Sequence, residues 1–152
     1  MLVPMSELRN RETIAIAADH GGFELKATLV AFLRERGIEV EDLGTDGPGS
    51  VDYPDFAEAV VEALLAGRAQ RGILLCGSGI GMSIAANRHK GIRAALCHDG
   101  LTARLARQHN DANILVLGGR LLGAEAAKDC LVNFLTTLFE GGRHARRVGK
   151  LG

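Results

Sequence analysis

The segment from Gly72 to Gly81 reads GILLCGSGIG, an apolar run followed by three glycines at alternate positions. A short, continuous apolar run is typical of a strand that is covered on both faces in a parallel sheet. Residues 80–88 have the pattern of a helix, so the segment predicts a strand, a tight glycine turn and a helix start. This unit is the building block of doubly wound α/β domains.

The same alternation runs through the chain. Strands are expected at residues 13–18, 38–43, 72–76, 92–97 and 113–117, and helices at 23–36, 53–65, 80–88, 101–108 and 124–139. The sequence therefore predicts an α/β fold: a three-layer αβα, doubly wound domain with a five-stranded parallel sheet, flavodoxin-like or Rossmann-like, in strand order 2-1-3-4-5. We expect this single domain to span residues 13–152 and end in a basic tail, after a flexible leader at 1–12.

Composition limits the possible partners. Among 152 residues, 18 Lys and Arg balance 18 Asp and Glu, and there is no Trp and one Tyr, so neither nucleic acid nor an anionic membrane is expected as a partner. No apolar run is long enough to span a membrane. The three cysteines are widely spaced without a C-x-x-C pair, which argues against disulfides and zinc and favours the cytoplasm.

Two loops are the strongest candidates for a binding site. Ligands of open α/β sheets bind beyond the carboxyl ends of the strands, where the strand order reverses. With the order above, this point lies between the first and third strands. It is therefore formed by residues 19–22, Asp-His-Gly-Gly, and by residues 77–81, Gly-Ser-Gly-Ile-Gly.

The glycine loop favours an anion. Gly77, Gly79 and Gly81 let the backbone approach a ligand closely at the start of a helix, where N–H groups lack helical partners. The spacing G-x-G-x-G after the third strand differs from the G-x-G-x-x-G of dinucleotide sites, and the Lys of a P-loop is missing. Nucleotide binding is therefore the weaker alternative.

Cys76 opens this loop and allows two interpretations. A cysteine at a strand end is often a small buried hydrophobic residue. At the start of a helix, however, the thiolate form is favoured and the sulfur becomes reactive. The residues alone leave both interpretations open, whereas Cys97 and Cys130 are expected to be inert.

Other polar residues are individually ambiguous. Asp19 and His20 follow the first strand, and Arg120 follows the fifth. His109-Asn110 could be an ordinary polar turn at a helix end. The cluster RHARR, residues 143–147, could be a solvated tail or a phosphate clamp.

Five segments in this order resemble the type B ribose-5-phosphate isomerases and the related galactose-6-phosphate isomerase subunits. The resemblance extends from Ile14 to Val148. It rests on Asp19–Gly22, Asp52–Pro54, Cys76–Gly81, Gln108–Asp111 and Arg143-His144 with Arg147-Val148.

The resemblance implies roles for the catalytic residues. Cys76 corresponds to the base that moves a proton between the first two carbons. Some relatives use a glutamate a few residues later, where this chain has Met82. His109 corresponds to the acid that opens the sugar ring, with Asp19 nearby. Ser78 joins the backbone of the glycine loop in holding the charge of an enediolate.

The resemblance also implies substrate contacts. Phosphate contacts are expected from His20, Arg120, Arg143 and Arg147. Contacts to the sugar are expected from Tyr53, Asn110 and the loop residues Gly77, Gly79, Ile80 and Gly81.

The implied activity is the interconversion of ribose 5-phosphate and ribulose 5-phosphate, without a metal or cofactor. Tetrose 4-phosphates and hexose 6-phosphates remain alternative substrates, and a non-catalytic phosphosugar-binding domain is a further alternative. A cysteine phosphatase would need an arginine within the loop, and residues 77–81 contain none.

The predicted topology separates the expected site residues. Residues 101–108 form a helix that leads about 12 Å away from the strand ends, so that His109 and the tail arginines lie far from Cys76 of the same chain. We therefore expect a homodimer with shared active sites, possibly a dimer of dimers.

Overall fold

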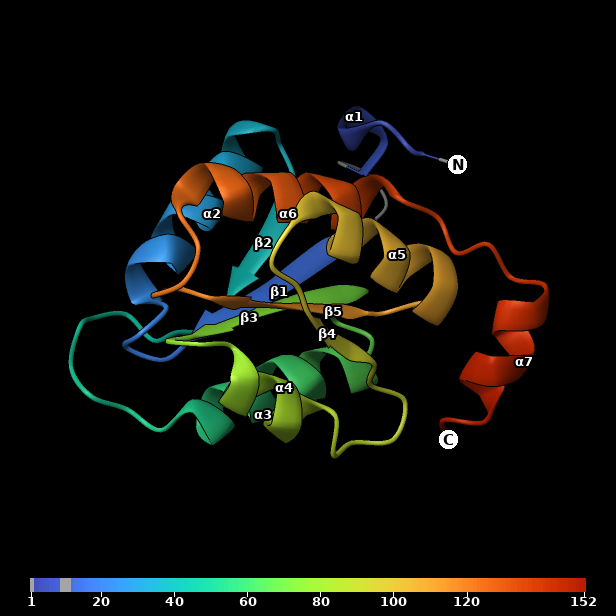
Figure 1. The fold of residues 1–152 in the computed structure, drawn as a ribbon. Coiled ribbons are helices and arrows are strands. Elements are labelled where there is room, and N and C mark those ends of the chain that lie inside the picture. The colour runs from blue at the N-terminus through green and yellow to red at the C-terminus, as the bar shows by residue number, and fades with distance from the viewer. Residues whose placement is uncertain (1, 9–11) are drawn as a thin grey trace.

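The computed structural model describes residues 2–8 and 12–152. Its five strands form one parallel sheet in the order β2-β1-β3-β5-β4. The α/β class is confirmed, and Figure 1 shows helices on both faces of the sheet. The strands are β1 (Thr13–Ala18), β2 (Glu39–Asp42), β3 (Arg71–Cys76), β4 (Ala94–Leu96) and β5 (Ile114–Gly118).

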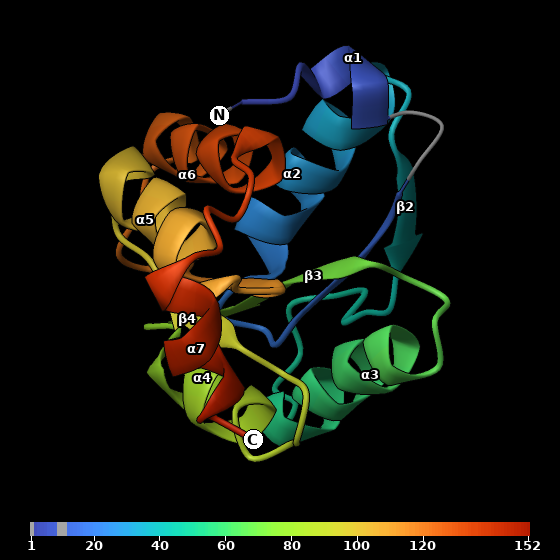
Figure 2. The same cartoon turned by 90° about the vertical axis from the view of Figure 1, so that its right-hand side faces the viewer.

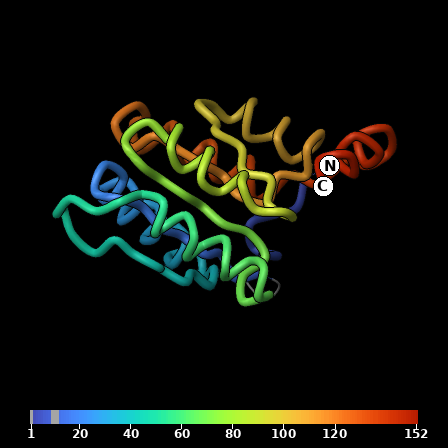
Figure 3. Tube along the Cα trace, turned by 90° about the horizontal axis from the view of Figure 1, so that it is seen from below, coloured from blue at the N-terminus to red at the C-terminus, as the bar shows by residue number. Residues whose placement is uncertain are grey.

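The helices form two outer layers. Helices α2, α5 and α6 cover one face of the sheet and α3 and α4 the other (Figure 2), and Figure 3 shows α3 and α4 side by side. None of the helices in the described ranges is long and apolar enough to cross a membrane. The helices are α1 (Met5–Leu8), α2 (Phe23–Glu35), α3 (Tyr53–Leu65), α4 (Ile80–Ala86), α5 (Gly100–Asn110), α6 (Ala124–Thr136) and α7 (Arg143–Gly149).

The last two strands are exchanged relative to the expected order 2-1-3-4-5. Strand β5 is buried along its whole length and pairs with β3 on one side and β4 on the other. Strand β4 has three half-buried residues and lies at the edge. Connections between parallel strands are right-handed. The chain runs from β3 to the edge strand β4 through α4 and back to β5 through α5, so the two connections run in opposite directions and their helices lie on opposite faces of the sheet. Helix α5 accordingly packs against α6.

The sheet has a separate apolar core on each face. Along β3, Ile73 and Leu75 belong to the core under α2 and α6, whereas Leu74 and Cys76 belong to the core under α3 and α4. This is the period-two alternation of a strand that is buried on both sides. It directs the side chain of Cys76 toward the α4 side of the sheet.

Local signals set where the helices begin. The backbone N–H of Thr102 donates to the Asp99 carboxylate at 2.7 Å, and this capping box starts α5. Helix α3 has Pro54 in its first turn, where a missing N–H costs nothing. Both helices begin on the side of the sheet to which the strands point (Figure 1).

The described part of the expected leader contacts the domain. The backbone N–H of Val3 donates to the carbonyl of Thr136 at 2.6 Å, and Leu8 is buried in the core under α6. Glu12 pairs with Arg71, whose guanidinium also donates to two carbonyls at the end of α6. These contacts join the described part of the leader to α6, whereas the sequence suggested a flexible segment. Residues 1 and 9–11 of that segment lie outside the described residues.

The C-terminal region departs from the expected boundaries. Helix α6 ends at Thr136, three residues before the expected end, and the basic tail folds into α7. Figure 1 shows α7 at the right, opposite the side to which the strand arrows point.

Candidate active site

Three loops meet at the carboxyl edge of the sheet. A Cβ atom on Gly21, after β1, would lie 2.8 Å from the backbone nitrogen of Gly77, after β3. A Cβ atom on Gly119, after β5, would lie 2.5 Å from the carbonyl oxygen of Gly21. Only residues without side chains fit at these contacts, so the loops form one continuous floor.

Cys76 lies at the base of this floor. Its side chain is buried, and the backbone N–H of Gly79 donates to its Sγ at 3.2 Å. Gly79 adopts φ +80°, the left-handed conformation that lets the loop curl around the sulfur. The sulfur therefore accepts a backbone N–H directly before the start of α4.

Ser78 adds a donor to the glycine loop. Its Oγ accepts a hydrogen bond from the backbone N–H of Ile80 at 3.2 Å. A hydroxyl that accepts in this way still has its own hydrogen to donate. The N–H groups of Gly79 and Ile80 are thus engaged within the loop, and the Ser78 hydroxyl is available to an incoming oxyanion.

Asp19 adjoins the same loop from β1. Its carboxylate accepts the backbone N–H of Gly21 at 2.8 Å, and its own N–H donates to the carbonyl of Leu75. The Cβ position of Gly21 lies within 3.3 Å of both Asp19 Oδ1 and the nitrogen of Gly77. A buried carboxylate is therefore held next to the start of the Cys76 loop.

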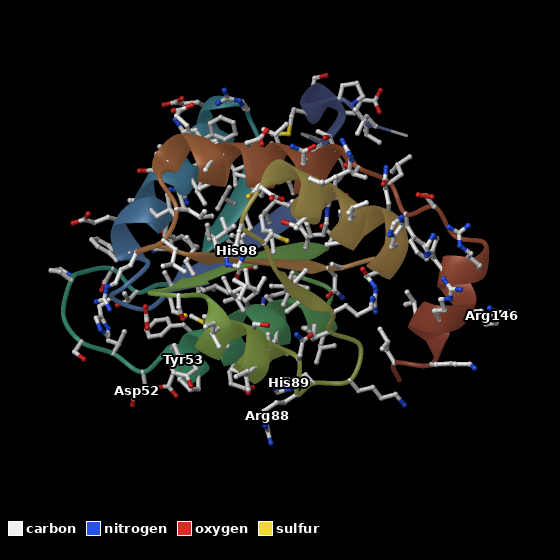
Figure 4. The ribbon with its side chains drawn as sticks, viewed as in Figure 1. Asp52, Tyr53, Arg88, His89, His98 and Arg146 are labelled. Carbon is white, nitrogen blue, oxygen red and sulfur yellow. The ribbon has the colours of Figure 1, made fainter. Side chains whose placement is uncertain are left out.

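His20 and Tyr53 border the floor on the α3 side. The Nδ1 atom of His20 accepts the backbone N–H of Val51 at 3.2 Å, which leaves Nε2 for a ligand. The ring of Tyr53 packs over Gly81, where a Cβ would lie 2.6 Å from Cζ. Figure 4 shows Tyr53 at the side to which the strands point. Gly81 therefore makes room for the tyrosine, a role that its spacing did not suggest.

Arg120 brings positive charge to this edge. Its backbone N–H donates to the carbonyl of Gly77 at 3.0 Å, and a Cβ on Gly77 would lie 3.2 Å from its Nη1. The side chain is exposed and lies along the glycine loop. It is suited to bind a phosphate beside Cys76.

The remaining expected residues lie elsewhere. His109 and Asn110 end α5, and Arg143 and Arg147 belong to α7. A cavity of about 300 Å³ is lined by His109, Asn110, His144 and Arg147, with Val148 and Leu151. The structure keeps this group apart from the Cys76 loop, as the direction of α5 predicts.

The structure adds two residues to the α7 group. The rings of His109 and His144 stack with centroids 4.3 Å apart and planes 9° from parallel, and Glu140 Oε1 lies 3.6 Å from His109 Nε2. Sequence reasoning named His144 within a motif but gave it no role, and it missed Glu140. The glycine pair at 141–142, which turns the chain between them, was the available signal.

These residues are a poor metal centre despite their proximity. One ligand atom each from His109, Glu140 and His144 lies within 4.8 Å of the others. Stacked rings hold their in-plane lone pairs in two separate, nearly parallel planes, so the two imidazoles do not converge on one ion. Arg143 and Arg147 also repel a cation. The arrangement is better suited to holding a proton.

The other two cysteines lie in the core under α2 and α6. Burial raises the pKa of Cys97 to about 11 and that of Cys130 to about 12. Both therefore remain thiols near neutral pH, in agreement with the expectation that they are inert.

A separate cavity has a volume of about 800 Å³. It lies between α2 and residues 42–56 and contains the buried Lys26, which pairs with Asp42 at 2.6 Å. None of the expected site residues lines it.

The family model described as Ribose/Galactose Isomerase matches residues 14–151. The chain belongs to this family. As a ribose/galactose isomerase it is an enzyme, and its family agrees with the resemblance drawn from the five segments.

Individual relatives support the family over nearly the whole chain. A solved ribose 5-phosphate isomerase from Thermotoga maritima is 59% identical with a TM-score of 0.92, covering 93% of this chain and 97% of that one. Ribose-5-phosphate isomerase B of Escherichia coli is 49% identical, covering 89% of this chain and 91% of its own. A D-erythrulose-4-phosphate isomerase of Pectobacterium atrosepticum is 45% identical, covering 92% and 93%.

Proposed function

We propose that this ribose/galactose isomerase interconverts ribose 5-phosphate and ribulose 5-phosphate through an enediolate. The observation that carries the proposal is the hydrogen bond from the Gly79 N–H to Cys76 Sγ, at the point where three loops meet. It prepares a thiolate to act as a base beside a glycine loop and an arginine. The relatives from Thermotoga maritima and Escherichia coli carry this activity in their names.

The proposed proton transfer needs one base and one oxyanion site. The Cys76 thiolate takes the proton from C2 of the open-chain aldose. The electron pair of that C–H bond forms the C1–C2 double bond and displaces the carbonyl pair onto O1, which gives the enediolate. The hydroxyl proton of O2 then passes to O1, the thiol returns its proton to C1, and the electron pair left on O2 forms the carbonyl at C2. The Ser78 hydroxyl stabilises the developing negative charge by donating to it. No step requires a metal or a cofactor.

Ring opening is assigned to His109. A protonated imidazole donates to the ring oxygen as the hemiacetal opens, while a nearby carboxylate such as Asp19 accepts the hydroxyl proton. His20 and Arg120 would bind the phosphate from the Cys76 side, and Arg143 and Arg147 from the α7 side.

This division requires a second copy of the chain. Large apolar side chains are exposed at the Cys76 edge. Tyr53, Ile80 and Leu101 lie where helices begin, and Leu121 lies in the turn after β5. We propose that another subunit covers this surface and brings its His109, Asn110, Arg143 and Arg147 to the Cys76 loop, giving a homodimer with two equivalent sites, possibly paired further. The cytoplasm is the proposed location, because all three cysteines are free thiols.

A substrate panel tests the proposal. Ribose 5-phosphate, erythrose 4-phosphate and allose 6-phosphate would be compared for ketose formation in the presence of a chelator. We expect kcat/KM to be highest with ribose 5-phosphate. A clear preference for the tetrose would instead assign the activity of the Pectobacterium relative, and no turnover of any sugar phosphate would leave a binding domain.

A further inference from the structure

The stacked pair of imidazoles is built by the chain segment between α6 and α7. The backbone N–H of Glu140 donates to the carbonyl of Gln108 at 3.0 Å, which attaches this segment to the end of α5. Gly141 and Gly142 follow with φ +71° and +56°, conformations that favour glycine. The turn places His144, one residue into α7, against the ring of His109.

The two rings have unequal surroundings. His144 is 7% exposed, and within the described part of the chain its buried Nε2 has no hydrogen-bond partner. The side chain of His109 is 39% exposed, and a carboxylate oxygen of Glu140 lies 3.6 Å from its Nε2. Water and a carboxylate can therefore stabilise a positive charge on His109, whereas burial opposes one on His144.

The charged groups around the pair act in the same direction. Burial and then the charges of Arg143, protonated His109 and Arg147 lower the pKa of His144, and only Glu140 opposes this shift. On α5 itself, Arg107 is paired with Asp111 at 2.9 Å. Two charged imidazoles at this separation would repel each other, so the geometry favours a single positive charge on the pair.

We propose that His144 is a positioning residue whose uncharged ring stacks on His109 and holds it as the single protonated imidazole of the pair. This inference rests on the proposed role of His109 in ring opening. A flat neighbour fixes the plane of the His109 ring and thus the direction in which its proton is donated. The neutral state of that neighbour removes a repulsion that would otherwise drive the proton off His109.

Proton occupancy can be measured directly. Long-range ¹H–¹⁵N spectra of histidine-labelled wild-type protein distinguish neutral from charged rings, and the two resonances are assigned by their loss in His109→Asn and His144→Phe. On lowering the pH from about 8 to 5, we expect His109 to gain its proton first while His144 stays neutral. Protonation of His144 before His109 would overturn the proposal, whatever reaction the enzyme catalyses.

Three variants test the stacking. His144→Phe keeps a flat neutral ring and should retain kcat for the cyclic aldose phosphate. His144→Ala removes the ring and should lower kcat about tenfold, the order expected for an aromatic pair, without raising KM. The control is Arg146→Gln on the outer side of α7, where Figure 4 shows the side chain directed away from the domain.

The outcomes separate this inference from the proposed function. Equal losses in His144→Phe and His144→Ala would mean that a ring nitrogen matters, and unchanged kcat in His144→Ala would mean that the stack does not; either result overturns the positioning role. If His109→Asn itself keeps full activity on cyclic substrates, the acid assignment fails, while the proton occupancy in the spectra is still decided. Circular dichroism checks folding, and if His144→Ala does not fold, the titration and His144→Phe still give a result.

Discussion

Cys76 and Cys97 both lie at strand ends, but their sulfur atoms have opposite surroundings. The Sγ of Cys76 accepts a backbone N–H, whereas that of Cys97 lies 3.6 Å from the carbonyl of Ala95, to which it can only donate. The sulfur of Cys76 is thus an acceptor and that of Cys97 a donor. The sequence left both interpretations of Cys76 open because it does not show whether a backbone N–H reaches the sulfur.

This contrast predicts which thiol reacts. At about pH 8, iodoacetamide should modify Cys76 and spare Cys97 and Cys130, whose pKa values are raised to about 11 and about 12. Peptide mass spectrometry after partial reaction measures the site, and substrate should slow the modification. Cys76→Ala should lower kcat by at least about a hundredfold, as loss of a general base does. A variant that keeps near-normal kcat would remove Cys76 from the mechanism.

Gly81 offers a second test at the residue scale. In Gly81→Ala the new methyl would lie 2.6 Å from the ring of Tyr53, which is partly exposed and can move aside. We expect near-normal thermal stability but a KM raised roughly severalfold, because displaced Tyr53 no longer borders the site. Gly49→Ala, with nothing within 4 Å, is the matched control. Equal KM values in the two variants would show that Tyr53 does not contact substrate.

At the scale of elements, apolar patterning predicted the five strands and the helices α2 to α6, but it predicted neither α1 and α7 nor the order of the strands. Strands β4 and β5 are both short apolar runs, and only their depth of burial decides which lies inside the sheet. Helix ends were also uncertain: α6 stops at Thr136, whose hydroxyl bonds back to the carbonyl of Val132. The contact between His109 and His144 joins residues of two helices through tertiary packing, which local patterns do not contain.

The phosphate assignment of α7 predicts a loss of substrate affinity. Arg143→Gln combined with Arg147→Gln should raise KM at least about tenfold, since charged hydrogen bonds to an anion contribute about 1.5–3 kcal/mol each. Arg146→Gln, on the same helix, should leave KM unchanged. Steady-state kinetics with both variants measures this, and equal KM values would show that Arg143 and Arg147 do not bind the phosphate.

His144 also predicts how stability depends on pH. Its folded pKa lies below the ordinary value of 6.5, which the unfolded chain regains, so between these two pKa values the unfolded state binds more protons. The contribution of His144 to stability is therefore full above about pH 6.5 and is lost as the pH falls below it. Urea unfolding from about pH 8 to 5 should show a larger fall for wild type than for His144→Phe. If the free energy of unfolding depends on pH in the same way for both proteins, the lowered pKa of His144 is contradicted.

At the scale of the whole molecule, the two groups of site residues lie at opposite ends of a single chain. Helix α5 begins beside the strand ends and its 11 residues span about 16 Å, with His109 in the last turn. Figure 1 shows α7 at that far end. The sequence predicted this separation because the direction of each helix follows from that of its strand. The proposed shared site in a twofold dimer would reunite the groups.

Complementation between two inactive variants tests this arrangement. Cys76→Ala and His109→Asn proteins would be unfolded, mixed in equal amounts and refolded. Random pairing makes half of the dimers mixed, and each mixed dimer has one site with both substitutions and one with neither. Activity should therefore return to roughly a quarter of wild type. The double variant refolded alone should stay inactive, which controls for residual activity.

The opposite result has an equally definite meaning. If differently tagged subunits co-purify, so that mixed dimers are present, and activity still does not return, then Cys76 and His109 must act within one chain. Helix α5 would then have to bring its far end to the Cys76 loop, which its packing along α6 prevents without unfolding. Such a result would therefore overturn the shared site, and it would show that the separation of His109 from the Cys76 loop seen in the single chain is not the arrangement of the working enzyme.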